Sequence, residues 1–592
     1  MLSVLSNWIF MGLLCGASGF ALLRGYHLVM NKLNPGSKEP AFGISHILMA
    51  GIVGTTLYAQ IFSVFGRVNA EAFLVLAAAS ILYLVWQRKA VASYLTEKLK
   101  EFKETQEDAQ KAAQEDAQTC DKVTKWLQTG AWGVFLLAVV AFACASCGQT
   151  KLIDTEWYHA QTIRWFEEYG CVKGVANIFY SLGFNNAQHY FDALFGMDWL
   201  YGQSMRGSGG FFGILMFGHG LFRLTGWRSH EKHLADALAI GEVTYSIIVT
   251  AFFTDPYVDT LPNVLVLFVL TEWFILLEKD CEDVREYGLY CLFALFAVVA
   301  KTSVAMIVLL AFYPVYLMLK QKKAKQIWVY LGMGFLLAVP YLITNFITTG
   351  YPVYLLASLG VLPVKWQVNP EVLRYSVDNM VAFARMPGAT MEEALTCGLR
   401  WVPVWFQNES ISHKLLYLGL VCLIFIDLGI VIKHLVKREE VDMKYLFPRL
   451  CVYAGLVYWF FTIPQVKYCW AFLIAPVAMV PVYYWEQKEG KHPLWQKGMV
   501  LLSVLLCLMY CGFYSLRTLG YMKDALTYPV MQADYKQFDM GIAEKNGRQF
   551  YVREEGKDLT CGYYLFPYLE NKDDLDSLVF EEDLGKGFYI EK

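Results

Sequence analysis

Long apolar runs separated by short polar segments fill most of this chain. About 14 runs can be recognised, and most span roughly 17–25 residues, the length at which a helix crosses a bilayer. They lie near residues 4–29, 42–65, 69–87, 127–147, 207–224, 235–254, 260–278, 303–319, 326–347, 414–433, 446–463, 468–485 and 498–516, with a shorter run at 286–301. The pattern predicts an all-α polytopic membrane protein with about 14 transmembrane helices.

Lysine and arginine gather in one set of alternate loops, which includes residues 88–125 and 320–325. Loops rich in these residues face the cytoplasm in membrane proteins. The opposite loops, 148–206 and 348–413, and the tail 519–592 are much poorer in basic residues. We therefore expect these segments and both termini to lie on the outer side of the membrane.

Four parts follow from this layout. Residues 1–92 are expected to form three N-terminal transmembrane helices, and 93–126, with mixed charges at helical spacing, a cytoplasmic helical connector. Residues 127–518 are the transmembrane core with its two external loops. The polar tail 519–592 alternates like strands and predicts a small external domain. With 56% hydrophobic residues, 17% charged residues and a net charge of −3, the composition excludes a soluble multidomain enzyme and gives no sign of a nucleic-acid partner.

The stretch 151–192 holds more polar, aromatic and glycine residues than its surroundings. If 154–170 is helical up to a C-terminal glycine, one face carries Asp154, Tyr158, Gln161 and Trp165. A carboxylate, a phenol, an amide and an indole on one stripe suit a sugar or a phosphate; a solvated loop helix with an aromatic underside is the alternative. Further polar groups of the stretch match no metal-ligand spacing and are expected to hydrogen-bond sugar or backbone: His159, His189, Asn177 and Asn185.

Two groups of carboxylates are expected at the outer membrane surface. Asp154 and Glu156 follow the run 127–147 after a short polar link, and Asp255 and Asp259 lie in a very short turn between two runs. Carboxylates in such places act as general bases or hold divalent cations, and both groups could face one cavity. Simple solvation of Asp154, and helix capping by Asp255 and Asp259, remain open alternatives.

Lys301 is flanked by apolar residues on both sides and is expected near the outer face. Ionisable residues inside a membrane are costly and usually functional. An ammonium group at this depth suits the phosphate of a lipid carrier, with Thr302 and Ser303 as further donors. Lys467, in another short outer turn, could supply a second positive charge. The alternative for Lys301 is a lysine that extends to the outer headgroups.

This arrangement resembles the GT-C superfamily of membrane glycosyltransferases. The motifs DTEWYHAQTIRWFEEYG, TTGYPVY and FFTIPQVKY look more closely like an uncharacterised group of bacterial polytopic proteins with a GT-C-like layout, from about residue 127 to the C-terminus. The resemblance implies a polyprenyl-phosphate sugar donor, an acidic residue in the first external loop, matched by Asp154, and a second in the next outer loop, matched by Asp255 or Asp259. Lys301 matches only a role, binding of the carrier phosphate. Where the closer group tends to carry an arginine, this chain has Tyr180 and Lys467.

These observations predict a glycosyltransferase in the bacterial plasma membrane that moves a sugar from a polyprenyl-phosphate carrier to a lipid or glycan acceptor, with inversion. Asp154 would deprotonate the acceptor, and Asp154 with Asp255 would hold a divalent cation if one is needed. The catalytic candidates are Asp154, Asp255 and Asp259. The candidates for substrate binding are Glu156, Tyr158, His159, Gln161, Trp165, Asn177, Asn185, Lys301 and Lys467.

Three alternatives stay open. A glycan polymerase or ligase would depend more on His159 or His189 than on Asp154. A flippase or other transporter of lipid-linked saccharides would place charges deep inside several helices, whereas the sequence suggests that nearly all charges lie at helix ends. No internal repeat of the transporter type is visible. A scaffold without activity is the third alternative.

Overall fold

The computed structural model describes residues 1–33, 42–98, 100, 119–487, 492–553 and 560–591. The predicted connector 93–126 lies largely outside these residues. Helices occupy all 14 predicted apolar runs. They are α1 (Leu2–Leu33), α2 (Ile44–Ser63), α3 (Ala70–Trp86), α5 (Thr119–Ala145), α9 (Ser208–Thr225), α10 (Leu234–Val249), α11 (Thr260–Glu278), α12 (Val284–Ala300), η6 (Thr302–Ala311) with α13 (Phe312–Lys320), α14 (Lys325–Thr349), α18 (Ile411–Val436), α19 (Met443–Thr462), α20 (Trp470–Glu486) and α21 (Leu494–Gly520).

Nine helices in the described part of the chain are long and apolar enough to cross a membrane. A tenth counts if α3 and the segment Arg88–Lys98, which meet at a bend of 80°, form one span. Helices suit this role because each satisfies its own backbone hydrogen bonds where no water is present. The prediction of an all-α membrane protein is therefore confirmed, while the number of 14 spans stays a prediction.

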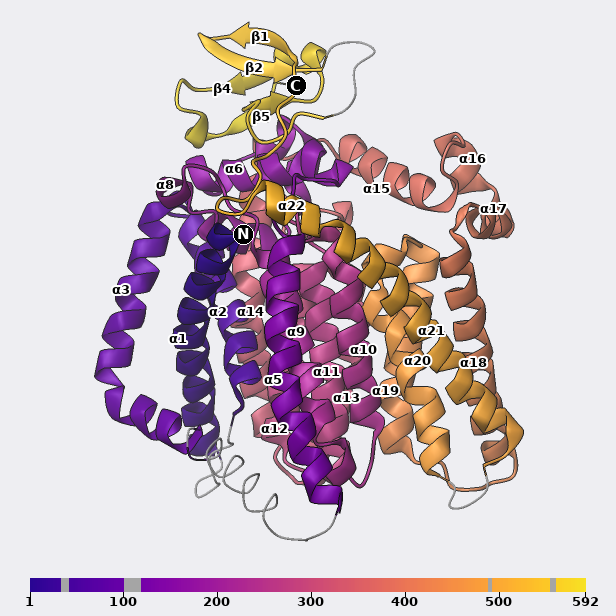
Figure 1. Ribbon diagram of the computed structural model, residues 1–592. Helices are drawn as coiled ribbons and strands as arrows, with labels where there is room; N and C mark the ends of the chain where they lie inside the picture. Colours follow the sequence, from indigo (N-terminus) through magenta and orange to yellow (C-terminus); the bar gives the residue numbers. More distant parts are fainter. Residues whose placement is uncertain (34–41, 99, 101–118, 488–491, 554–559, 592) are drawn as a thin grey trace.

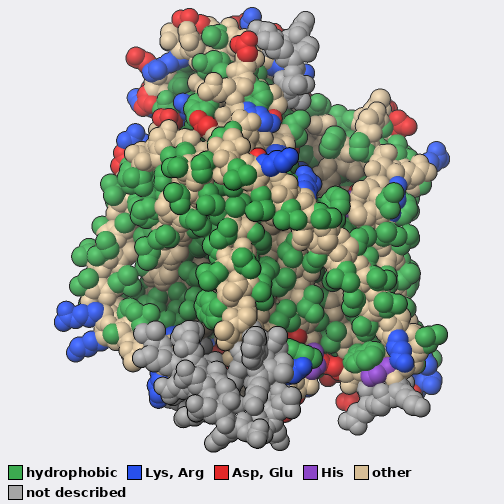
Figure 2. All heavy atoms as spheres, viewed as in Figure 1, with side chains coloured by type: hydrophobic (Ala, Val, Ile, Leu, Met, Phe, Trp, Pro, Cys, Tyr) green, Lys and Arg blue, Asp and Glu red, His purple; other side chains and the backbone are tan. Residues whose placement is uncertain are grey.

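The outer surface of the helical body is apolar. Large side chains such as Leu331, Phe335 and Leu336 on α14 are more than half exposed. Figure 2 shows hydrophobic side chains covering the middle of the molecule, with acidic and basic side chains gathered at its two ends. A band of this kind is stable when lipid, rather than water, surrounds it.

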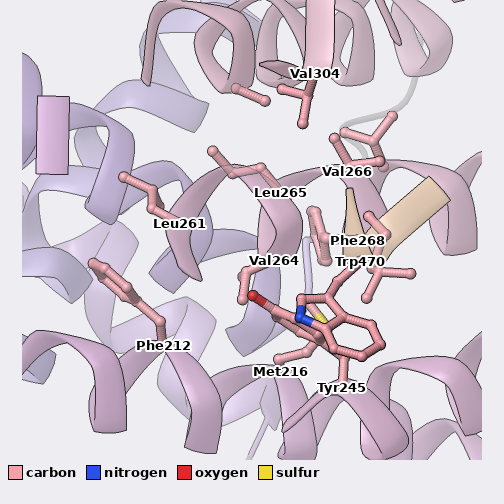
Figure 3. Close-up of a cluster of buried hydrophobic side chains, with 14 of the residues drawn as sticks. Phe212, Met216, Tyr245, Leu261, Val264, Leu265, Val266, Phe268, Val304 and Trp470 are labelled. Atoms are coloured by element: carbon pink, nitrogen blue, oxygen red, sulfur yellow. The ribbon is translucent and has the colours of Figure 1, made fainter. Parts of the chain in front are cut away.

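Helix α11 lies at the centre of the body, and its whole apolar window is buried. Leu265, Val266 and Phe268 of this helix are fully buried. They pack among side chains from α9, α10, η6 and α20, and Figure 3 shows this cluster. A helix that is apolar all round needs such an enclosed position. Because α11 is held on every side, the turn at its start, which carries Asp259, has a fixed position.

Short elements between the helices cover one end of the body, which we call the capped end (Figure 1). Loop 148–206 contributes η1 (Thr155–His159), α6 (Ala160–Glu168), η2 (Val175–Asn177), η3 (Tyr180–Phe184), α7 (Ala187–Leu194) and α8 (Asp198–Tyr201). Loop 348–413 contributes η7 (Ala357–Leu359), α15 (Pro370–Arg385), α16 (Met391–Thr396), η8 (Gly398–Arg400) and α17 (Trp401–Asn408). Other short helices of the chain are η4 (Trp227–Ser229), η5 (Thr250–Phe252), η9 (Val466–Tyr468) and α22 (Met522–Thr527), of which η4 joins α9 to α10 at the opposite end of the body.

The C-terminal segment forms two small sheets at the capped end. Strands β1 (Gly541–Lys545), β2 (Arg548–Val552) and β3 (Tyr568–Leu569) pair in the order β1-β2-β3, the first pair antiparallel and the second parallel. Strands β4 (Leu578–Phe580) and β5 (Phe588–Ile590) pair antiparallel, beside η10 (Lys572–Leu575) and η11 (Leu584–Lys586). The strand-like alternation that begins at Arg548 corresponds to β2. In the segment 562–568, only Tyr568 belongs to a strand, β3.

Both termini lie at the capped end (Figure 1). The amino group of Met1 donates a hydrogen bond to the carbonyl oxygen of Tyr528 at 2.7 Å. The expectation that the termini share one side of the membrane agrees with this arrangement, and which side that is stays a prediction.

The expectation that nearly all charges lie at helix ends is wrong. His219 of α9 bonds Glu242 of α10 at 2.8 Å through Nδ1 and Glu272 of α11 at 2.9 Å through Nε2. His46 of α2 lies 3.3 Å from the second oxygen of Glu272. A further buried carboxylate, Asp427, lies inside α18. A few charges inside long apolar runs barely change the average hydropathy, so run length alone did not reveal them.

Candidate functional site

Four charged side chains from four separate segments pair at the capped end. Asp154, just before η1, accepts a hydrogen bond from the Lys467 ammonium at 2.6 Å. Lys301, which ends α12, donates directly to a carboxylate oxygen of Asp259, the residue before α11. We call these four residues the charge quartet. The sequence predicted a meeting of distant carboxylates with an ammonium group, and the structure contains two such pairs.

Tyr468 joins the two pairs. The ammonium of Lys301 lies 4.2 Å from the centre of the Tyr468 ring, and that of Lys467 lies 5.2 Å from it. A cation over an aromatic face is attracted by the ring's negative face. One ring therefore contacts both lysines and holds the two ion pairs as neighbours.

Buried Asn263 of α11 fixes the spacing of the two pairs. Its Nδ2 donates to the carbonyl oxygen of Asp259 at 2.8 Å and to that of Lys467 at 3.4 Å, and its Oδ1 accepts from the amide of Ala471 at 2.8 Å. One amide side chain thus connects the turn before α11 to the turn before α20. The only signal for it in the sequence is a single asparagine inside an apolar run.

A cavity of about 170 Å³ opens beside the quartet. Lys301 and Tyr468 line it, together with Tyr158 and Asn185 from the first capping loop. Its other walls are Phe184, Asn186, Val299, Ala300, Thr302, Ser303, Tyr341, Val353, Tyr354, Leu355, Met380, Tyr458, Trp459, Thr462 and Ile463. Drug-sized sites measure roughly 300–1,000 Å³, so this one suits a single small polar group set against an aromatic wall.

Burial controls the electrostatics of this site. Burial raises the pKa of Asp259, against the opposing effect of the charges on Lys301 and Lys467. Burial also lowers the pKa of His159 and of His189 well below the usual range, and the charge on Lys301 adds to the effect on both. These two rings lie 4.9 Å apart, centre to centre. Both imidazoles are therefore neutral near pH 7, and the positive charge of the site resides on the lysines.

The predicted helix 154–170 is present, but it begins with a π-helical turn, η1, before α6. A π turn adds a residue to the local repeat and shifts the faces that follow it. Asp154 binds Lys467 and Tyr158 lines the cavity, whereas Gln161 and Trp165 face the C-terminal segment. The predicted single face is thus divided in two.

Three predicted substrate-binding residues instead hold the C-terminal segment. Gln161 donates to the carbonyl oxygens of Gly562 and Leu565 at 2.8 and 2.9 Å. Trp165 is buried against Phe566, with ring centres 4.7 Å apart. Glu156 accepts a hydrogen bond from Lys536 at 2.5 Å. Gln161 and Glu156 already bind protein groups and Trp165 is buried against Phe566, so all three side chains are engaged with the C-terminal segment rather than with the cavity.

Asn177 and Asn185 have different roles. Asn177 donates to the carbonyl oxygen of Trp366 at 2.9 Å and so ties the two capping loops together. Asn185 lines the cavity, where it donates to the Thr344 hydroxyl at 2.9 Å and accepts from Tyr190 at 2.5 Å. Only Asn185 lies where a bound molecule could contact it.

Asp255 does not join the quartet. Its carboxylate accepts hydrogen bonds from the backbone amides of Lys151 and Leu152 at 3.1 Å and from the Thr254 hydroxyl at 2.7 Å. Burial raises the pKa of Asp255, and these donors oppose that effect. An acid whose oxygens already bind three donors is a poor metal ligand, so the predicted Asp154–Asp255 cation pair does not fit this arrangement. No group of three or more metal-ligating side chains occurs in the described ranges.

The fold and its apolar surface define a multi-pass membrane protein with a polar, partly enclosed site at one end of the helical body. Residues 1–114 and 108–474 match the family model described as "Domain of unknown function (DUF8201)", and the chain belongs to this family. No curated protein and no solved structure matches the chain.

Proposed function

We propose that this protein is an integral-membrane glycosyltransferase of GT-C-like layout, with about 14 spans, that transfers a sugar from a polyprenyl-phosphate carrier to a lipid or glycan acceptor. In this proposal it resides in the bacterial plasma membrane, and the capped end, with both termini and the C-terminal domain, faces outward. The observation that carries the proposal is the charge quartet beside a cavity lined by aromatic and hydroxyl groups.

The quartet contains the groups that this reaction needs. Asp154 accepts the proton of the acceptor hydroxyl, and the freed oxygen forms a bond to the anomeric carbon with inversion. The bond between that carbon and the phosphate oxygen breaks, and its electron pair leaves with the carrier phosphate. Lys301 and Lys467 then stabilise the charge on that phosphate, an effect that is strong where water is excluded.

A reconstituted assay tests the proposal. Full-length protein in proteoliposomes is incubated with a panel of radiolabelled polyprenyl-phosphate hexoses and pentoses and a mixed lipid-glycan acceptor extract. The variant Asp154→Asn should slow transfer by about 10²–10⁴-fold, the usual contribution of a general base. The matched control Glu168→Gln, a half-exposed acid at the end of α6, should keep the wild-type rate. A wild-type rate for Asp154→Asn would contradict the assigned base.

A second candidate function is transport of a lipid-linked saccharide. It is favoured by the chain of ionisable groups His46, Glu272, His219 and Glu242 inside the helical body. Networks of this kind mark ion and proton pathways in pumps and transporters. The same proteoliposomes separate the two functions, because a transporter moves the intact lipid-linked saccharide across the bilayer without cleaving the sugar–phosphate bond. Loss of that movement in Glu242→Gln, with no sugar transfer by the wild type, would favour the transporter.

A further inference from the structure

A second, much larger cavity lies at the end of the helical body opposite the capped end. It has a volume of about 1,140 Å³ and lies between α13, α18, α19 and α20, the helices at the lower right of Figure 1. This volume matches the upper end of known ligand sites, roughly 1,000 Å³. The cavity does not touch the charge quartet, so its contents are independent of the proposed reaction.

Arg449 contributes to the wall of this cavity, and its guanidinium is buried there. Arg449 is 1% exposed, and none of its three nitrogen atoms has a hydrogen-bond partner among the described residues. Its position six residues into α19 corresponds to a depth of about 9 Å along the helix. A buried guanidinium with unused donors costs considerable free energy unless something accepts those bonds.

The nearest carboxylate does not meet this need. Asp427 lies 3.5 Å from a nitrogen of Arg449, outside good hydrogen-bond geometry. Its own oxygens accept from Tyr453 at 2.5 Å and Tyr484 at 2.7 Å. One face of the guanidinium lies over the Tyr483 ring at 3.8 Å. The stacked face is therefore occupied, while the buried donating edges lack the acceptors that a bidentate anion would supply.

The rest of the wall suits an amphiphile. Phe312 and Tyr316 of α13 line the cavity and are 64% and 58% exposed, which gives it an aromatic side facing the lipid band. Lys232, Lys320 and Lys444 stand at the rim with the acids Asp280, Glu282, Glu440 and Asp442. The rim lysines pair with Asp280 or Glu282 at 3.5–4.0 Å, contacts that are weak when exposed. The rim charges thus offset one another, whereas the buried Arg449 has no hydrogen-bonded partner among the described residues.

We propose that this cavity binds a phosphorylated lipid, with its phosphate on the edge of Arg449 and its apolar chain along Phe312 and Tyr316. Arginine pairs with phosphate through two parallel hydrogen bonds, which explains why this residue, and not a lysine, would stand at the inner wall. The volume exceeds what a free phosphate needs, and the aromatic side gives an acyl chain a surface to cover.

Native mass spectrometry of the full-length protein in detergent tests this site. The probes are phosphatidylglycerol, diacylglycerol as its neutral match, and inorganic phosphate. The double variant Asp427→Asn/Arg449→Gln removes both charges while keeping both side chains polar, so no buried charge is left unpaired. We expect it to weaken phosphatidylglycerol binding by about tenfold or more, equivalent to 1.4 kcal/mol, with diacylglycerol binding unchanged.

A variant of an exposed residue tests the same cavity without removing a buried side chain on which folding could depend. Tyr316→Ser changes an exposed side chain, and we expect it to weaken phosphatidylglycerol binding without affecting inorganic phosphate. Equal binding of phosphatidylglycerol and diacylglycerol, or unchanged phosphatidylglycerol binding in both variants, would overturn the proposal. Binding of inorganic phosphate that depends on Arg449 while phosphatidylglycerol does not bind would also overturn it, in favour of a soluble anion.

Discussion

Removing one charge of the Lys301–Asp259 pair should destabilise the protein far more than removing both. The side chains are 18% and 3% exposed, so the pair is almost fully withdrawn from solvent. Loss of one partner from a buried pair costs about 3–5 kcal/mol, because the other charge is left buried and unpaired. Replacement of both partners by neutral residues of similar size is often close to neutral. The variants are Lys301→Met, Asp259→Asn and their combination.

The measurement is the apparent Tm of the detergent-solubilised protein, followed by intrinsic fluorescence. A chain with this many helices does not unfold in a simple two-state manner, so the order of the Tm values is the reliable readout. We expect the Tm of both single variants to be well below that of the wild type, and the Tm of the double variant to return most of the way to the wild-type value. The matched control is Lys467→Met/Asp154→Asn. Those side chains are 28% and 25% exposed, so their single variants should lose less stability than the single variants of the Lys301–Asp259 pair.

Two results would refute this reasoning. If Lys301→Met has the same Tm as the wild type, the ammonium group extends towards the lipid headgroups and its pair with Asp259 contributes nothing to stability. If the double variant loses as much as the two single variants added together, the residues do not interact. Under the proposed function, the recovered double variant should still be inactive, which separates the structural role of the pair from its chemical role.

Two further predictions concern other parts of the fold. Burial raises the pKa of Glu167 from 4.5 to about 8, so between these values the folded state holds a proton that the unfolded state has lost, and stability falls as pH rises. The stability of Glu167→Gln relative to the wild type should therefore rise by up to ~1.4 kcal/mol per pH unit across that window. The measurement is the Tm of both proteins as a function of pH. A Tm difference that does not change with pH would contradict this prediction. A Cβ on Gly51 would lie 1.9 Å from the carbonyl oxygen of Cys15, whereas one on Gly16 would meet nothing within 4 Å. Gly51→Ala should therefore lower the Tm markedly and Gly16→Ala should not, and equal Tm values would contradict the close contact of α1 and α2.

The sequence was a good guide to the helices because the membrane imposes one rule on every span. Any apolar run of bilayer length must satisfy its backbone internally, so run length alone located α1 or α14. Run length said little about which side chains bond to one another across the core. Glu242 and Glu272 lie in runs whose apolar average conceals them, and only the packing of α9 between them shows that His219 bonds both.

The site was predicted in part, for a similar reason. Asp154, Asp259, Lys301 and Lys467 are constrained by short links to the ends of long helices, so their common depth followed from the chain. Gln161 and Trp165 were misassigned because a π turn precedes them and because strands far along the chain cover that face. A periodicity argument assumes 3.6 residues per turn and an uncovered face, and neither condition held there.

The quartet has a consequence for the order of events in the proposed reaction. Each lysine of the quartet is paired with a carboxylate, and Asp154 is bound to Lys467 at 2.6 Å. The oxygen held by Lys467 cannot face the proton of an acceptor hydroxyl while this hydrogen bond lasts. A carrier phosphate that binds Lys467 would compete with Asp154 for the ammonium and release the carboxylate. Donor binding would thus create the base that the acceptor needs, and an acceptor arriving alone would find Asp154 still paired.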